Sequence, residues 1–140
     1  MSRFFNSFAA LVILCAAAFL LVCGYWMFWP VRLLEAKQPL HIITTDIQKG
    51  KELVYEFDYC RYTTLDALSS RQIICRNRMY ILPDVRGNVP PGCAKGRRSI
   101  FLPSEMDPDT CFVHFSSTFV VNPLRTVTLL FDTESFVIRK

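Results

Sequence analysis

Glycine is scarce in this sequence, and acidic residues are missing from its first thirty positions. Only 5 of the 140 residues are glycine, and none belongs to the glycine-rich loop that cradles phosphate groups in nucleotide-binding proteins. A chain of this length is also too short for a doubly wound nucleotide enzyme with a second domain, or for a TIM barrel. It has room for one ordinary domain, or for a smaller domain behind a membrane segment.

Charge is absent from residues 8–29, which read FAALVILCAAAFLLVCGYWMFW. As an α-helix, this run would extend about 33 Å and cross the hydrocarbon core of a bilayer. Aromatic rings gather at its end, where they suit the headgroup region, and Pro30 ends the helix. The run is longer than the apolar part of a signal peptide and has bulky rings where a cleavage site would lie. The sequence therefore predicts an uncleaved transmembrane anchor over residues 1–30.

Positive charge does not decide the orientation of this anchor, since Arg3 stands before it and Arg32 and Lys37 follow it. Because the segment before the anchor is short, we expect a signal anchor with a cytoplasmic N-terminus. The protein is then a single-pass membrane protein whose partner along the apolar run is the lipid bilayer. A short linker over residues 31–38 leads to an extracytoplasmic domain over residues 39–140, which we expect in the periplasm.

Six cysteines fall into two groups. Cys15 and Cys23 lie in the apolar run and serve as small apolar residues of the anchor. The other four contain no C-x-x-C pair, which speaks against a zinc ribbon or a thioredoxin-like motif. Spread cysteines beyond an anchor indicate an oxidising compartment and structural disulfides, and four of them allow three pairings. These four are Cys60, Cys75, Cys93 and Cys111.

Beyond the anchor, apolar and polar residues alternate with the period of two that is typical of half-buried strands. Tyr55 and Phe57, for example, share one strand face, and Glu56 and Asp58 share the other. Many short strands at close spacing predict an all-β fold, a single antiparallel sandwich of the immunoglobulin-like kind. We expect about seven strands, roughly at 39–45, 52–61, 71–82, 98–102, 110–121, 124–132 and 134–139.

Four segments carry a resemblance to known proteins: GKELVYEFDYCRY (50–62), PPGC (90–93), VNPLRTVT (121–128) and TESFVI (133–138). They resemble segments of small phage-encoded proteins that have an N-terminal anchor, one β-sandwich and no assigned activity. The resemblance implies a disulfide between Cys60 and Cys93, which would join an early strand to the loop after the third strand. It leaves open whether Cys75 and Cys111 form a second pair, and it transfers no functional residue.

Residue types that occur in active sites are present, but not in recognisable patterns. The two histidines, His41 and His114, lack the neighbours that a hydrolytic triad requires. Together with thiols they could offer soft ligands to copper or zinc, yet no pair has a known ligand spacing. The sequence therefore predicts no catalytic residue, no metal and no cofactor, and a protein that is not an enzyme. An envelope enzyme or metal carrier that uses these histidines with nearby thiols or acids remains an alternative.

The charge feature above background is a basic region from residue 71 to residue 98, in which seven basic residues stand against Asp84 alone. We expect Arg76 and Arg78 on one strand face and residues 95–98 in a loop. Such a surface beside a membrane suits anionic headgroups, an acidic polymer or an acidic protein, although edge arginines also discourage aggregation of strands. The seven residues are Arg71, Arg76, Arg78, Arg86, Lys95, Arg97 and Arg98.

Taken together, these features favour a membrane-tethered, extracytoplasmic binding module without enzymatic activity. Its basic region would contact an envelope protein, an acidic polymer or a second copy of the chain. A phage-encoded module of this kind would act at the envelope of the host. Nucleic acid is not expected as a partner, because the sequence has no base-stacking motif. The remaining alternative is a structural membrane protein that assembles through the Cys15–Cys23 face of its helix, where small residues permit close approach.

Overall fold

The computed structural model describes residues 2–87 and 89–139, and the chain divides into two compact units. The helical unit comprises Met1–Val31 with Asn122–Arg125, and the strand unit comprises Arg32–Val121 with Thr126–Lys140. The two units differ in sequence pattern, because the helical unit contains the uncharged run 8–29 and the strand unit alternates between polar and apolar residues.

The helical unit is built around α1, which runs from Ser2 to Phe28. From residue 8 to residue 28 its side chains are uncharged, and the large ones are exposed, as at Leu14 and Leu21, so this stretch has no charged face of the kind that suits water. The stretch Ser7–Phe28 is long and apolar enough to cross a membrane. The predicted apolar helix is therefore confirmed, while its insertion into a bilayer stays a prediction.

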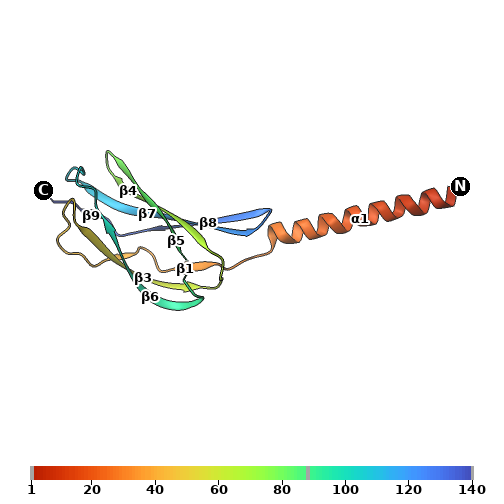
Figure 1. The fold of residues 1–140 in the computed structure, drawn as a ribbon, viewed down its shortest axis with the longest axis horizontal. Coiled ribbons are helices and arrows are strands. Elements are labelled where there is room, and N and C mark those ends of the chain that lie inside the picture. Colours follow the sequence, from red (N-terminus) through yellow and green to blue (C-terminus); the bar gives the residue numbers. More distant parts are fainter. Residues whose placement is uncertain (1, 88, 140) are drawn as a thin grey trace. The chain divides into compact units, whose positions relative to one another are not determined.

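The strand unit contains two antiparallel sheets (Figure 1). In the first sheet, β3 lies at the centre, with β6 on one side and the short strands β1 and β2 on the other. These strands are β1 (Leu34–Ala36), β2 (His41–Ile42), β3 (Glu52–Arg61) and β6 (Gly92–Phe101). All ten residues of β6 pair with β3, so this ladder fixes which side chains share a face.

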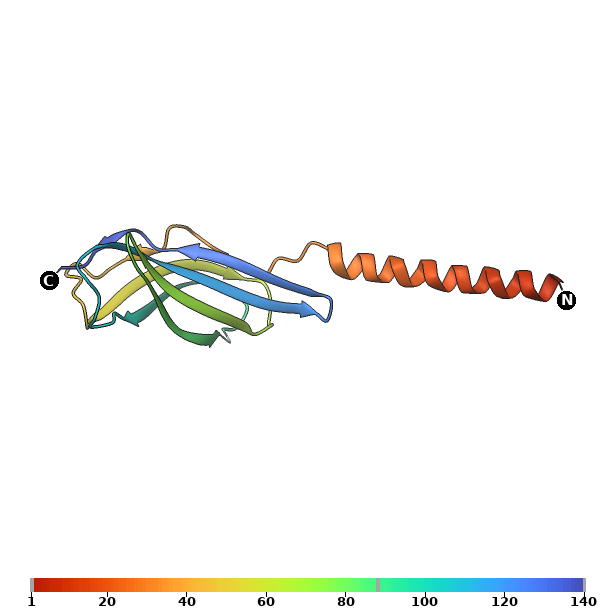
Figure 2. The same ribbon diagram turned by 90° about the horizontal axis from the view of Figure 1, so that it is seen from above.

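The second sheet has the order β5-β4-β7-β8, and β9 pairs with β7. Its strands are β4 (Ala67–Cys75), β5 (Met79–Gly87), β7 (Thr110–Asn122), β8 (Arg125–Asp132) and β9 (Phe136–Val137). The pairing of β4 with β7 joins strands that are not consecutive in the chain, so the sheet cannot be a simple meander. Figure 2 shows the two layers of strands from a second direction.

The two sheets face each other across one hydrophobic core. Alternate residues of each long strand point inward, including Leu53 of β3 and Ile73 of β4, both with no exposed surface. The rings of Tyr55 and Phe115 meet between the sheets with centroids 5.1 Å apart. Mostly antiparallel β structure behind an apolar helix is thus confirmed, as the period-two pattern predicts.

Two disulfides bridge neighbouring strands within a sheet. Cys60 of β3 pairs with Cys93 of β6, and Cys75 of β4 pairs with Cys111 of β7. The predicted disulfide bonds are confirmed, and the first pairing is the one that the resemblance implies. Each bridge closes a stretch of more than thirty residues, so each restricts the unfolded chain substantially.

The structure corrects the prediction of one strand over residues 71–82. The chain reverses at residues 76–78, and the amide of Cys75 donates a hydrogen bond to the carbonyl of Arg78. Arg76 and Arg78 therefore flank a hairpin turn and do not project from one strand face. The turn carries no glycine or proline, the residues that most often mark one in a sequence.

Two further segments assigned to connections are strands. Residues 34–36, within the predicted linker, form β1 and pair with the end of β3. Residues 92–97, predicted as a loop, belong to β6, so Cys93 lies in a strand and not in a loop. Glycine, lysine and arginine are poor indicators of a strand, but the ten-residue partnership with β3 outweighs these local preferences.

Replacing both Cys60 and Cys93 with alanine tests the contribution of the first disulfide. We expect the free energy of unfolding to fall by about 2–4 kcal/mol, because the unfolded chain regains the freedom of a long loop. Denaturant unfolding of the full chain in a neutral detergent, followed by circular dichroism, measures this change. The control replaces the unpaired Cys15 and should leave the unfolding midpoint unchanged. A wild-type midpoint that does not respond to reductant would contradict the prediction.

Candidate ligand-binding cavity

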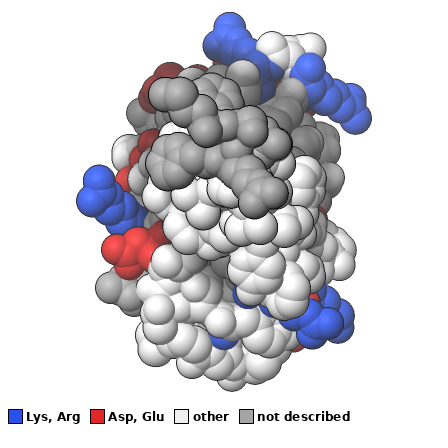
Figure 3. Space-filling model, turned by 90° about the vertical axis from the view of Figure 1, so that its right-hand side faces the viewer, with Lys and Arg blue, Asp and Glu red and all other residues white. Residues whose placement is uncertain are grey.

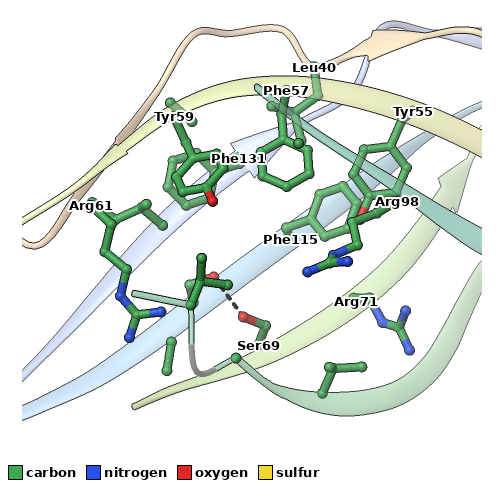
Figure 4. A pocket seen from close by; sticks show the side chains of 18 of the residues that line it. Leu40, Tyr55, Phe57, Tyr59, Arg61, Ser69, Arg71, Arg98, Phe115 and Phe131 are labelled. Atoms are coloured by element: carbon green, nitrogen blue, oxygen red, sulfur yellow. Dashed lines mark hydrogen bonds between the residues drawn. The ribbon is translucent and has the colours of Figure 1, made fainter. Parts of the chain in front are cut away.

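A cavity of about 430 Å³ lies between the two sheets of the strand unit. This volume falls in the range of about 300–1,000 Å³ that is typical of small-molecule sites. The lining comes from both sheets, and aromatic rings make up much of it (Figure 4). The rings belong to Tyr55, Phe57, Tyr59, Phe115, Phe119 and Phe131.

Small residues on the inner faces leave this space unfilled. Ser69 of β4 and Ser117 of β7 lie opposite each other in the ladder, and their hydroxyl groups are 2.9 Å apart. In the facing sheet, Gly96 of β6 stands opposite Phe57 of β3. A Cβ atom on Gly96 would lie 2.7 Å from Cζ of Phe57, so the ring lies over the glycine and depends on the missing side chain.

The aromatic wall of the cavity follows the inner face of β3. Tyr55 and Phe57 are stacked with centroids 5.9 Å apart, and Phe57 and Tyr59 follow at 5.3 Å. Phe115 of the opposite sheet completes the contact with Tyr55. Ring separations in this range are favourable for aromatic pairs, so the wall holds its shape while the space beside it stays open.

Two arginines from opposite sheets stand together at the Tyr55 end of the cavity (Figure 4). Arg71 belongs to β4 and is half-buried, whereas Arg98 belongs to β6 and is exposed. Arg71 donates from Nε and Nη2 to the carbonyl of Pro83, at 3.2 and 2.8 Å. Burial raises the pKa of Tyr55 to about 12, and the charges of Arg71 and Arg98 oppose that rise. The field of both arginines therefore reaches the hydroxyl group.

Arg61 at the end of β3 also lines the cavity, and only 5% of its surface is exposed. Its Nε donates to the carbonyl of Thr63 at 2.9 Å, and Nη2 donates to the carbonyl of Leu65. Within residues 2–87 and 89–139, no acidic side chain forms an ion pair with Arg61, Arg71 or Arg98. The cavity thus carries positive charge without a matching carboxylate in the described part of the chain.

Three other members of the predicted basic region, Lys95, Arg97 and Arg78, have acidic partners. On the outer face of the first sheet, Nζ of Lys95 lies 2.7 Å from Glu56, and Arg97 lies 3.8 Å from the same carboxylate. The hydrogen bond from Lys95 lowers the pKa of Glu56 below its usual value. At the hairpin, Arg78 pairs with Asp107 at 3.2 Å.

The predicted basic region is therefore divided by the fold. Arg71 and Arg98 face the cavity, Arg86 and Arg97 line its edge, and the remaining three members point elsewhere. On the face that Figure 3 shows, Lys and Arg side chains lie in separate places near the rim, and Asp or Glu atoms lie beside some of them. Arg61 joins the cavity from outside the predicted region, and its position at the end of an inward-facing alternation is the sequence signal that marks it.

The two histidines occupy separate places and have separate partners. Nδ1 of His41 lies 2.9 Å from Glu134, and Nδ1 of His114 lies 2.6 Å from Asp132. The hydrogen bond with His41 lowers the pKa of Glu134. Among the described residues, no group of three or more His, Cys, Asp or Glu side chains could hold a metal ion. The geometry therefore offers no support for the alternative of a histidine-based metal carrier.

Comparison with protein-family models and with curated proteins finds no match. Among solved structures, the chain is similar to the Pseudomonas fluorescens alkylpurine DNA glycosylase AlkC bound to DNA containing an abasic site analogue. The identity is 11% and the TM-score is 0.38, over 70% of this chain and 30% of that chain. This chain thus matches less than a third of the length of that protein.

This comparison corrects the prediction that the protein is not an enzyme. The similar structure is that of an enzyme, and nothing positively shows that this chain is not one, so the prediction is not kept. A TM-score of 0.38 is too low to transfer an activity or a DNA substrate to this chain. We therefore assign no reaction to this chain. The cavity has the volume of a small-molecule site.

Replacing Gly96 with alanine tests the close contact in the aromatic wall. The added methyl group must displace the ring of Phe57, and we expect the free energy of unfolding to fall by about 1–3 kcal/mol, as overpacking does. The matched control is Gly87→Ala, because a Cβ atom there meets nothing within 4 Å. Denaturant unfolding of both variants measures the difference, and equal stability of the two would contradict the proposed contact.

The raised pKa of Tyr55 predicts a loss of stability in alkali. Since the folded-state pKa is about 12 against 10.0 for the ordinary group, the contribution of Tyr55 is complete below about pH 10 and is lost as the pH rises through about 12. The loss should be on the order of 2–3 kcal/mol. Across that window the wild type should lose this stability and Tyr55→Phe should not, so the difference between their unfolding free energies should change by the same amount.

The same substitution at Tyr80, which does not line the cavity, serves as the control for this experiment. Its stability should run parallel to that of the wild type over the whole window. Parallel behaviour of Tyr55→Phe instead would show that the hydroxyl group ionises as freely in the folded protein as in the unfolded chain.

Proposed function

We propose that this protein is a membrane-tethered, extracytoplasmic binding module whose cavity holds a ligand with an anionic group. The observation that carries the proposal is the cavity itself, which combines aromatic walls with arginines that have no acidic partner in the described chain. Pockets that are mostly apolar, with a few convergent polar groups, are the usual form of a ligand site. Guanidinium groups suit carboxylate and phosphate oxygens in particular.

The tether and the compartment are supported by two independent features. The apolar helix α1 has the length and composition of a membrane span. The strand unit contains two disulfides, and such bonds persist in oxidising compartments. A signal-anchor orientation joins these features, since it places the strand unit outside the cytoplasm. If the chain is phage-encoded, as its resemblance implies, the compartment is the envelope of the host.

We also propose that the strand unit is an immunoglobulin-like sandwich. Two facing antiparallel sheets with a non-sequential β4–β7 pairing support this assignment. The disulfides differ from the usual pattern, in which one bridge joins the two sheets, because here each lies within a sheet. Covalent bonds therefore leave the separation of the sheets unconstrained at the cavity.

The test begins with the full chain in membranes. We expect it to remain in the membrane fraction after an alkaline wash and, once solubilised in a neutral maltoside detergent, to gain thermal stability from anionic probes. Three probes are used: dodecyl phosphate, dodecanoate and anilinonaphthalene sulfonate. A ligand present at about 100 times its Kd adds about 2.7 kcal/mol to the free energy of unfolding, which raises Tm by several degrees.

A cavity-filling variant makes the test specific. Ser69→Leu places a large side chain in the cavity, whereas Ser70→Leu places the same side chain on the opposite face of β4. Stabilisation by a probe should be lost in the first variant and kept in the second. Should Ser69→Leu fail to fold, Ser69→Ala should fold and keep binding, and Gly87→Leu provides the blocking variant. The proposal fails if no probe stabilises the wild type more than the blocked variant.

A further inference from the structure

We infer that the cavity takes a single-chain amphiphile, with its anionic head between Arg71 and Arg98 and its hydrocarbon chain along the inner face of β3. This inference rests on the proposed function and adds the chemical class of the ligand. A fatty acid and an alkyl phosphate share the required chemistry, which is one acidic head on one apolar chain.

The dimensions of the cavity favour a chain. Its lining follows β3 from Tyr55 to Arg61, a distance of about 20 Å at the rise of a strand. A volume of about 430 Å³ over that length gives a mean cross-section of roughly 20 Å². One methylene chain with neighbours at about 4 Å occupies roughly 16–20 Å². Fused rings lying across the cavity would need a wider space.

The two ends of the cavity differ in a way that gives the ligand a direction. At one end, Arg98 is exposed and has no ion-pair partner in the described chain, and Arg71 lies on the opposite wall (Figure 4). At the other end, Arg61 is buried and donates to the carbonyl groups of Thr63 and Leu65. The available charge is therefore at the exposed end, where an anionic head can keep part of its hydration.

The walls between these ends suit a hydrocarbon chain. Phe57, Tyr59 and Phe131 present aromatic surface along the path. The hydroxyl groups of Ser69 and Ser117 are hydrogen-bonded to each other, one donating and the other accepting, so each oxygen already has a partner within the wall. An apolar chain thus leaves no unpaired polar group there, whereas a sugar or a peptide would bring donors and acceptors without partners.

The experiment compares ligands that differ in one part only. For the full chain in neutral detergent, we expect dodecyl phosphate and dodecanoate to raise Tm and dodecanol to raise it much less. Inorganic phosphate alone should have no effect. Arg98→Gln should lower the affinity for dodecyl phosphate about tenfold, because one charge-assisted hydrogen bond is lost. Arg98→Lys should recover part of that affinity.

Lys95→Gln is the matched control, because it removes the same charge from the same strand but on the outer face, beside Glu56. It should change the affinity less than twofold. Each probe is measured against Ser69→Leu, so that partition into micelles is subtracted. Affinity should rise with chain length from hexyl phosphate and then level off once the chain reaches the Arg61 end.

Three results would overturn the inference. Equal affinities for dodecanol and dodecyl phosphate would show that the anionic head group does not contribute to binding. Equal effects of the Arg98 and Lys95 variants would show that the head group does not bind at Arg98. Binding of anilinonaphthalene sulfonate without binding of either alkyl anion would show that the cavity takes rings. In that last case the proposed function stands and only the ligand class fails, whereas failure of every probe removes both.

Discussion

The register of β3 against β6 is the constraint on which the rest of the strand unit depends. It sets Phe57 opposite Gly96, Tyr55 opposite Arg98, and Cys60 opposite Cys93. A shift by one residue would exchange the two faces of the strand, so the rings would turn to solvent and the glycine would no longer lie beneath Phe57. The disulfide locks this register covalently, and the part of the cavity wall that the first sheet supplies follows from it.

An open cavity in a β-sheet core needs an explanation, because cores are normally packed as densely as crystals. Here the rings of β3 pack against one another along the strand and therefore cannot all lean into the space. Ser69 and Ser117, on neighbouring strands of the second sheet, are too small to fill it, and one of their hydroxyl groups donates a hydrogen bond to the other. Contacts within each wall of the cavity therefore keep it open, and contacts between the two walls are not needed for this.

Much of this fold follows from the alternation of residues, and the parts that do not follow have physical reasons. The strand predicted over residues 52–61 matches β3, because Leu53 and Tyr55 carry strong inward preferences. The hairpin at residues 76–78 escaped prediction because no glycine or proline marks it. The first part of β6 escaped prediction because Gly92 and Gly96 are poor indicators of a strand, although Gly96 allows the close contact with Phe57 of β3.

The candidate site was harder to predict, because the predicted basic region is one continuous segment of sequence, whereas the cavity is lined by residues from several separate segments. Charge alone put Lys95, Arg97 and Arg98 together, whereas strand parity separates them. Arg98 shares its face with the buried Ile100, and its two basic neighbours share theirs with Ser99. Parity could have singled out Arg98, but its pairing with Arg71 across two sheets depends on the tertiary fold.

The basic side chains of the strand unit include two groups, those that pair with carboxylates outside the cavity and those that face the cavity without such a partner among the described residues. On the outer face, basic side chains meet carboxylates, as Lys95 meets Glu56 and Arg78 meets Asp107, and exposed pairs of this kind contribute little to stability. On the inner face, positive charge lies beside aromatic rings without such a partner in the described chain. Desolvating a guanidinium there is costly unless an anion accompanies it, so the same arrangement that weakens the empty domain would strengthen its complex with an acidic ligand.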